Sequence, residues 1–99
     1  MELTKPQEKF LRSLAHDRKP VIWLGQHGLT GNVLQEIETA LDYHELIKIK
    51  LRVGDRDLRD QIIGDICTST RATAVQRTGN ILTIYRKNRK TPRIILPKK

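Results

Sequence analysis

Residues 46–53 read Leu-Ile-Lys-Ile-Lys-Leu-Arg-Val, so apolar and mostly basic side chains alternate with a period of two. Successive side chains of a β-strand point to opposite faces of a sheet, so this stretch predicts a strand with one apolar face. The other face would carry Lys48, Lys50 and Arg52. A sheet with one wet face is covered by helices on its other face only, which favours a two-layer fold.

A second strand and a helix are predicted before this stretch. Residues 20–24 form an apolar run between proline and glycine, which is typical of a short buried strand, and we expect Trp23 to pack in the core. Thr30 is placed to cap a following helix. The apolar side of that helix would consist of Val33, Leu34, Ile37, Ala40 and Leu41, with Glu36 and Glu38 pointing outward.

A third helix and a hairpin are predicted after it. Asp57 is placed to cap the helix, whose inward side chains would be Leu58, Ile62, Ile63, Ile66 and Cys67. The strands 73–77 and 81–86 then flank Thr78-Gly79-Asn80. Glycine and asparagine accept a positive φ, so this pattern indicates a β-hairpin.

The N-terminal segment predicts one more helix. Thr4 is placed as its N-cap, Gln7 can return a capping-box hydrogen bond, and the helix should end near His16 because Lys19-Pro20 follows. The expected fold is therefore α/β, an α+β two-layer sandwich with an N-terminal helix followed by βαβαββ. We expect a single domain over residues 1–99, in which 87–99 form a basic, extended tail docked by Ile94, Ile95 and Leu96.

The charge of the chain is large and unevenly distributed. The formal net charge is +8 for 99 residues. Residues 21–46 contain four acids and no Lys or Arg, whereas residues 86–99 contain seven basic residues and no acid. Such an excess of positive charge is typical of proteins that bind polyanions, and nucleic acid is the expected partner. With only four aromatic residues, the chain cannot offer several platforms for stacking bases.

Several other classes of protein are disfavoured. There is no apolar stretch of membrane-spanning length, no secretory signal pattern and only one cysteine, so we expect a cytoplasmic protein. The glycines do not match nucleotide-binding motifs, and His44-Glu45 lacks the second histidine of a zinc helix. Asp55, Asp57, Asp60 and Asp65 fit capping and a solvated helix face. We expect no catalytic residue, metal or cofactor.

The segment Gly25-Gln26-His27-Gly28 joins the first predicted strand to a capped helix. A Gly-x-x-Gly loop lets the backbone approach a phosphate closely, and the positive end of the following helix favours an anion. This short motif is common in proteins, and a purely structural turn is the alternative. Together with the basic residues, it defines the predicted RNA-binding set: Gly25, Gln26, His27, Gly28, Thr30, Lys5, Lys9, Arg12, Arg18, Lys19, Lys48, Lys50, Arg52, Arg86 and Lys87.

The chain resembles a known family in several separated motifs that occur in one order. They are Lys19-Pro20-Val21, Leu24-Gly25, Gly28-Leu29-Thr30, residues 34–38, His44-Glu45-Leu46-Ile47-Lys48, Gly79 and residues 82–86. On these motifs it is similar to the CRM domain (chloroplast RNA splicing and ribosome maturation), in the stand-alone bacterial form of the YhbY family.

This resemblance implies a mixed four-stranded sheet like that of the C-terminal domain of translation initiation factor three, with an added N-terminal helix. It also implies that the Gly25–Gly28 loop contacts RNA and that the protein acts on precursors of the large ribosomal subunit. Many family members carry lysine in or beside the loop, whereas this chain has Gln26 and His27. We therefore expect lysines and arginines elsewhere to supply most of the charge.

The expected function is RNA binding in ribosome assembly, through phosphate contacts rather than base-by-base readout. The alternative is a protein-interaction module that docks a basic partner, such as a ribosomal protein, through Glu36, Glu38 and Asp42. A short chain without a spare apolar stripe favours a monomer.

Overall fold

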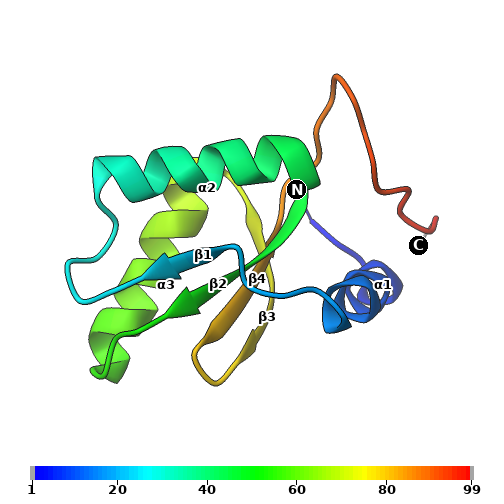
Figure 1. Cartoon of the computed structure of the whole chain (residues 1–99). Coiled ribbons are helices and arrows are strands. Elements are labelled where there is room, and N and C mark those ends of the chain that lie inside the picture. Colours follow the sequence, from blue (N-terminus) through cyan, green and yellow to red (C-terminus); the bar gives the residue numbers. More distant parts are fainter. Residues whose placement is uncertain (1, 99) are drawn as a thin grey trace.

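A computed structural model describes residues 2–98 and contains three helices around a four-stranded sheet (Figure 1). The elements are α1 (Lys5–His16), β1 (Ile22–Leu24), α2 (Gly31–His44), β2 (Leu46–Leu51), α3 (Arg56–Thr70), β3 (Thr73–Thr78) and β4 (Ile81–Tyr85). The strand order is β1-β2-β4-β3, with β1 parallel to β2 and the other pairs antiparallel. The predicted fold class, element order and mixed sheet are confirmed.

The main core lies between the sheet and the helices α2 and α3. Ile47, Ile49 and Leu51 of β2 are buried there, as the alternating pattern predicts. Ile37 of α2 and Ile66 of α3 are fully buried against them. The face of β2 that carries Lys48 and Lys50 therefore points away from α2 and α3.

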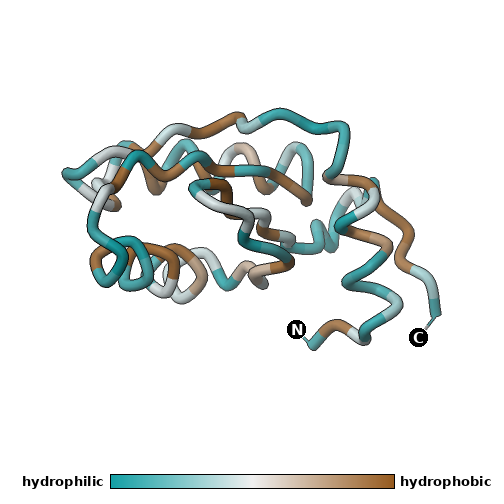
Figure 2. Tube along the Cα trace, turned by 90° about the horizontal axis from the view of Figure 1, so that it is seen from below, coloured by the Kyte–Doolittle hydropathy of each residue, from teal (hydrophilic) through white to brown (hydrophobic). Residues whose placement is uncertain are grey.

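The opposite face of the sheet is not entirely free of helices, which corrects one expectation. Leu11 and Ala15 of α1 form a second buried cluster with Leu46, Val75 and Tyr85. Figures 1 and 2 both show α1 at one end of the molecule, beside the C-terminal segment and apart from α2. Thus α1 covers one end of this face and leaves the rest open.

The helix caps agree with the sequence at two helices of three. Thr4 and Gln7 form the predicted capping box on α1, and the hydroxyl of Thr30 accepts a hydrogen bond from the Val33 amide at the start of α2. The cap of α3 is Asp55, not Asp57, because the Asp55 carboxylate accepts from the amides of Asp57 and Leu58. As a result Leu58 lies in the exposed first turn rather than in the core.

The C-terminal segment has no helix or strand over residues 87–98 but is held by a buried carboxylate. Glu45 is fully buried and accepts hydrogen bonds from the amides of Asn88, Arg93 and Ile94 at 2.6–2.7 Å. Ile94 is buried and Leu96 is half-buried in the cluster below α1, whereas Ile95 is 88% exposed. The predicted docking is confirmed for Ile94 and Leu96 and is wrong for Ile95.

Tyr85, at the end of β4, has a fully buried side chain. Its hydroxyl has no hydrogen-bond partner within residues 2–98. Burial raises the pKa of Tyr85 above its ordinary value of 10.0, and the charge of Glu45 raises this pKa further. The folded chain therefore binds a proton more tightly at Tyr85 than the unfolded chain does.

This difference in pKa predicts a loss of stability in alkali. The contribution of Tyr85 is complete below about pH 10 and is lost as the pH rises towards the pKa of the folded state. We expect Tyr85→Phe to reduce this loss and to leave the free energy of unfolding at neutral pH equal or higher, because it removes a buried hydroxyl without a partner. Urea unfolding of both proteins at neutral pH and above pH 10 checks this. An equal alkaline loss of stability in the variant and the wild type would contradict it.

Candidate nucleic-acid interface

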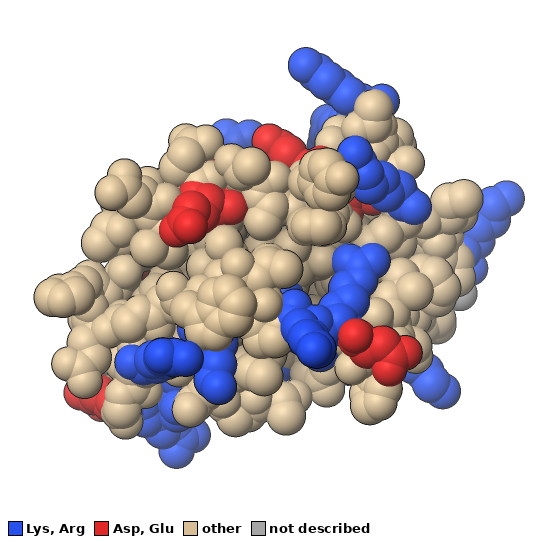
Figure 3. All heavy atoms as spheres, viewed as in Figure 1, with Lys and Arg blue, Asp and Glu red and all other residues tan. Residues whose placement is uncertain are grey.

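The open face of the sheet carries the basic side chains of β2. Lys48 and Lys50 are half-buried along the strand, and Arg52 continues the same side, exposed, just beyond its end. Lys48 is paired in register with Thr83 of β4, and Lys50 is paired with Trp23 of β1. Figure 3 shows basic side chains over the strands and towards α1, while acidic side chains lie on the side of α2 and also beside the basic side chains near α1.

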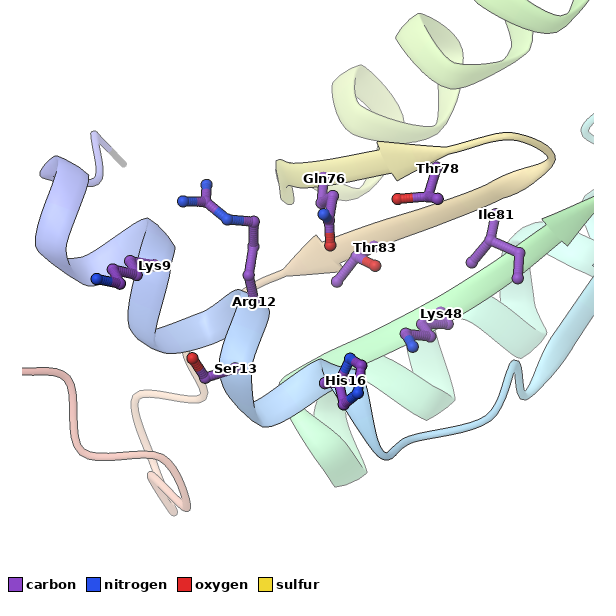
Figure 4. A pocket seen from close by; sticks show the side chains of 9 residues that line it. All are labelled: Lys9, Arg12, Ser13, His16, Lys48, Gln76, Thr78, Ile81 and Thr83. Atoms are coloured by element: carbon purple, nitrogen blue, oxygen red, sulfur yellow. The ribbon is translucent and has the colours of Figure 1, made fainter.

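A hollow of about 620 Å³ lies between α1 and this open face. Figure 4 shows the residues around it, with Arg12 and His16 on α1, Lys48 on β2, and Gln76 and Thr78 on β3. We call it the α1–sheet hollow; its lining is Lys9, Arg12, Ser13, His16, Lys48, Gln76, Thr78, Ile81 and Thr83.

The α1–sheet hollow is suited to an anion. Its lining contains the cations of Lys9, Arg12 and Lys48 and no carboxylate. The only acid within ion-pair distance of these cations, among the residues described, is Glu8, at 3.7 Å from the Arg12 guanidinium. This i,i+4 pair is solvent-exposed and therefore contributes little, so Arg12 is available to a ligand.

A second, smaller hollow extends the basic surface around the entry to β1. It has a volume of about 360 Å³ and shares Lys48 with the α1–sheet hollow. Arg18 and Lys19 line it, but the Arg18 guanidinium also donates a 2.7 Å hydrogen bond to the carbonyl oxygen of Leu46. Arg18 thus helps to hold α1 against the sheet, while Lys19 is exposed.

The Gly25–Gly28 loop is a tight turn at the other end of β1. The Gly28 amide donates to the Gly25 carbonyl oxygen at 3.1 Å, and Gly28 has a φ of +75°, which favours glycine. Gln26 and His27 are exposed at the tip, and their amides donate no hydrogen bond to any group in residues 2–98. The loop therefore presents free backbone donors just before the N-terminus of α2, where an anion is favoured.

The predicted RNA-binding residues are distributed over three places. Lys9, Arg12 and Lys48 line the α1–sheet hollow, Arg18 and Lys19 line the hollow that adjoins it, and Lys5 is exposed at the start of α1. A second group gathers at the opposite end of β1 and β2. It consists of Lys50, Arg52, the Gly25–Gly28 loop and Thr30, whose hydroxyl is occupied as the α2 cap.

Arg86 and Lys87 lie apart from both groups. The Arg86 guanidinium pairs with the carboxylates of Glu38 at 2.7 Å and Asp42 at 2.8 Å, and it also donates to the carbonyl oxygen of Thr70. Lys87 is exposed beside Asp42 and the C-terminal segment. Arg86 is therefore a structural cation that ties β4 to α2 and α3, and it is not a free member of the basic surface.

The same ion pairs bear on the predicted acidic docking surface of α2. Glu38 and Asp42, two of its three acids, are engaged by Arg86. Only Glu36 of this set has no ion pair with a described residue. One positive charge within the chain thus offsets part of the negative charge of α2.

Trp23 is a residue whose environment the sequence analysis assigned wrongly. It was expected in the core, but its side chain is 54% exposed on the open face, between the buried Ile22 and Leu24. An apolar run of three residues does not show which side chain faces the core, because that depends on the pairing of β1 with β2. The useful signal is its in-register partner, Lys50, which belongs to the basic side of residues 46–53.

Side chains that could bind a metal ion do not gather in the described part of the chain. Residues 2–98 contain no group of three or more His, Cys, Asp or Glu side chains that could hold a metal ion. Burial raises the pKa of the Cys67 thiol, although a hydrogen bond with the Ala74 backbone opposes this effect, so the reactive thiolate is disfavoured. Within residues 2–98, each helix is too short or too polar to span a bilayer.

Known proteins resemble this chain along nearly its whole length. A family model described as the CRS1/YhbY (CRM) domain matches residues 3–86. A protein of Haemophilus influenzae named "RNA-binding protein" is 46% identical, with 98% of this chain and 97% of the relative covered. A "Probable RNA-binding protein" of Bacillus subtilis is 30% identical over 96% of this chain and 99% of its own length.

A solved structure shows the same fold. It is the solution structure of a Staphylococcus aureus protein, described as a hypothetical protein and a candidate RNA-binding protein. The TM-score is 0.81 and the identity is 32%, with 97% of this chain and all of the other chain covered.

Proposed function

Because the chain belongs to the CRS1/YhbY (CRM) domain family, we propose that it is an RNA-binding protein that grips the phosphate backbone of structured RNA and assists assembly of the large ribosomal subunit. The observation that carries this proposal is the α1–sheet hollow, which is lined by three cations from two elements and by no carboxylate. Each phosphate neutralised by such a cation releases counterions, so binding should weaken steeply with salt. The names of the relatives agree with an RNA partner.

The open face offers two anchors for one RNA strand or helix. The α1–sheet hollow lies at one end of it, and Lys50, Arg52 and the Gly25–Gly28 loop lie at the other. The hollow supplies charge, and the loop supplies backbone donors that can approach a phosphate closely. Two anchors on a rigid sheet recognise the spacing of phosphates, and therefore the shape of an RNA rather than its sequence.

The ribosomal part of the proposal rests on the family. We propose that the RNA belongs to large-subunit precursors, that the protein acts in the cytoplasm as a monomer, and that it binds without catalysis. Ribonuclease treatment distinguishes this from docking through α2. Association with ribosomal particles is expected to be lost after digestion, whereas persistence would favour a protein partner.

The contribution of the loop can be tested without disturbing the fold. An added Cβ at Gly25 meets no atom within 4 Å, and Gly25 does not have the positive φ of Gly28. We expect Gly25→Val to lower RNA affinity by about 10-fold, since its side chain stands where a phosphate would approach. Fluorescence anisotropy with a labelled RNA hairpin measures this.

A matched control shows whether the effect is specific to the loop. Gly64→Val lies at an exposed position of α3, away from the open face of the sheet, and an added Cβ there also meets no atom within 4 Å. It should leave the affinity within about twofold of the wild type, because the change lies outside the turn that bears the free amides. Wild-type affinity in a folded Gly25→Val protein would show that the loop is only structural.

A further inference from the structure

Trp23 is an exposed aromatic platform inside the proposed RNA-binding face. Its neighbours along β1, Ile22 and Leu24, are 6% and 1% exposed, whereas Trp23 is 54% exposed. The two buried neighbours therefore hold the backbone of Trp23 in the strand, and its indole faces outward. A planar ligand that binds there has only the side chain of this residue to order.

The surroundings of Trp23 are basic. Its partner in the sheet register is Lys50, and Arg52 follows on the same side of β2. Val21, two residues earlier, is also exposed, but the adjoining strand β2 offers cations, which an apolar protein segment would not require. A π-surface beside cations is suited to a nucleotide, which combines a flat base with a negative phosphate.

Trp23 is also close to the Gly25–Gly28 loop. It precedes Gly25 by two residues, which is about 7 Å along an extended strand. One nucleotide can therefore place its base on the indole and its phosphate against Lys50 or the Gly25–Gly28 loop. A base within a helix is already stacked on both sides, so only an unpaired base is free to do this.

We propose that Trp23 stacks on one unpaired base of the bound RNA, and that the target is therefore a helix with a bulge or other unpaired nucleotide rather than a continuous duplex. This inference rests on the proposed RNA binding and adds a structural requirement for the RNA. Stacking is tolerant of base identity, so it selects an unpaired position and not a sequence.

The test uses the full chain and three RNA hairpins of the same stem. One has a single-nucleotide bulge, one has an abasic nucleotide at the bulge, and one is fully paired. Trp23 is the only tryptophan of the chain, so its fluorescence reports on this site alone. We expect the bulged hairpin to quench the emission and to bind about 10-fold more tightly than the other two, which lies within the usual effect of one stacked base.

Variants assign the effect to the indole. Trp23→Ala should lose the preference for the bulged hairpin while binding the paired hairpin as the wild type does, and Trp23→Phe should keep part of the preference. The matched control is Tyr43→Ala, since Tyr43 is also an exposed aromatic residue, 64% exposed, but lies on α2. Its preference should equal that of the wild type.

The outcomes separate this inference from the proposed function. If the wild type binds no hairpin, the proposed function fails. If it binds all three hairpins equally and the emission does not change, RNA binding stands and the stacking role is overturned. Equal weakening of all three hairpins by Trp23→Ala would also overturn it, because the indole would then support the face rather than a base.

Discussion

Replacing Arg12 and Lys48 together by glutamate is expected to lower the affinity for a structured RNA by about 50-fold or more at 0.1 M salt. The two side chains come from α1 and β2 and line the same α1–sheet hollow. The loss of one phosphate contact lowers the slope of log affinity against log salt by about 0.7 to 0.9. Over the one decade between about 1 M and 0.1 M salt, this is a loss of roughly 5- to 8-fold in affinity. Two contacts multiply these factors, and the reversed charges add repulsion.

The salt dependence identifies the mechanism of this loss. The slope of log affinity against log salt should decrease by about 1.4 to 1.8 in the double variant. Fluorescence anisotropy of a labelled hairpin over a range of salt concentrations measures both quantities. The control is the double variant Arg89→Glu with Lys90→Glu, which changes the net charge equally but lies in the exposed C-terminal segment outside the hollow. Equal losses in the two proteins would show that net charge, and not the hollow, determines binding.

Replacing Glu45 by alanine is expected to lower the free energy of unfolding by about 3 to 5 kcal/mol. The Glu45 carboxylate is fully buried and accepts three backbone amides, those of Asn88, Arg93 and Ile94. Without the carboxylate, these amides either stay buried without an acceptor, or the C-terminal segment detaches so that they bind water. Detachment would expose the cluster that contains Ile94. The free energy of unfolding of a domain of this size is about 5 to 15 kcal/mol in total, so the loss is severe.

Urea unfolding followed by circular dichroism measures this loss from the transition midpoint and its slope. Glu45→Gln should lie between alanine and the wild type, since its amide oxygen can still accept the amides of Arg93 and Ile94, while its NH₂ cannot accept from Asn88. Glu36→Ala, at an exposed position of α2, is the control and should change stability by about 0.5 kcal/mol at most. A similarly small effect of Glu45→Ala would contradict the role of the buried carboxylate.

The parts of the fold that were predictable are those set by local chemistry. The alternation in residues 46–53 identifies β2 and its buried face, and Thr4 and Thr30 mark the starts of two helices. Thr78-Gly79-Asn80 marks the hairpin, in which Gly79 has a φ of +58°. In each case the signal is a repeat, a cap or a turn that lies within a few residues of the sequence.

The errors arise where residues distant in sequence decide the environment. Trp23 faces outward because of its pairing with β2, and Arg86 is neutralised by acids that lie more than 40 positions earlier. The covering of the second sheet face by α1 did leave a signal. Leu46 is the apolar exception on the otherwise basic side of residues 46–53, and it packs against Leu11 and Ala15.

The sequence predicts which residues belong to the candidate site better than it predicts how they are arranged. The sequence identifies the cations and the Gly25–Gly28 loop. It does not show that Lys9 and Arg12 line the same hollow as Lys48, because this depends on the docking of α1. Arg86 is held by Glu38 and Asp42 of α2, and Lys87 lies beside Asp42, so the fold places neither in the α1–sheet hollow or at the loop. Charge alone therefore defined a larger surface than the one the fold assembles.

We propose that RNA lies on the open face of the sheet, between the α1–sheet hollow and the Gly25–Gly28 loop. Titrating an RNA hairpin into the isotope-labelled full chain, and following the amide and indole N–H signals by NMR, tests this most directly. We expect the shifts to concentrate in the second half of α1, in β2, in the loop and at the indole of Trp23. Shifts confined to α2 around Glu36, with the β2 and loop signals unchanged, would contradict it.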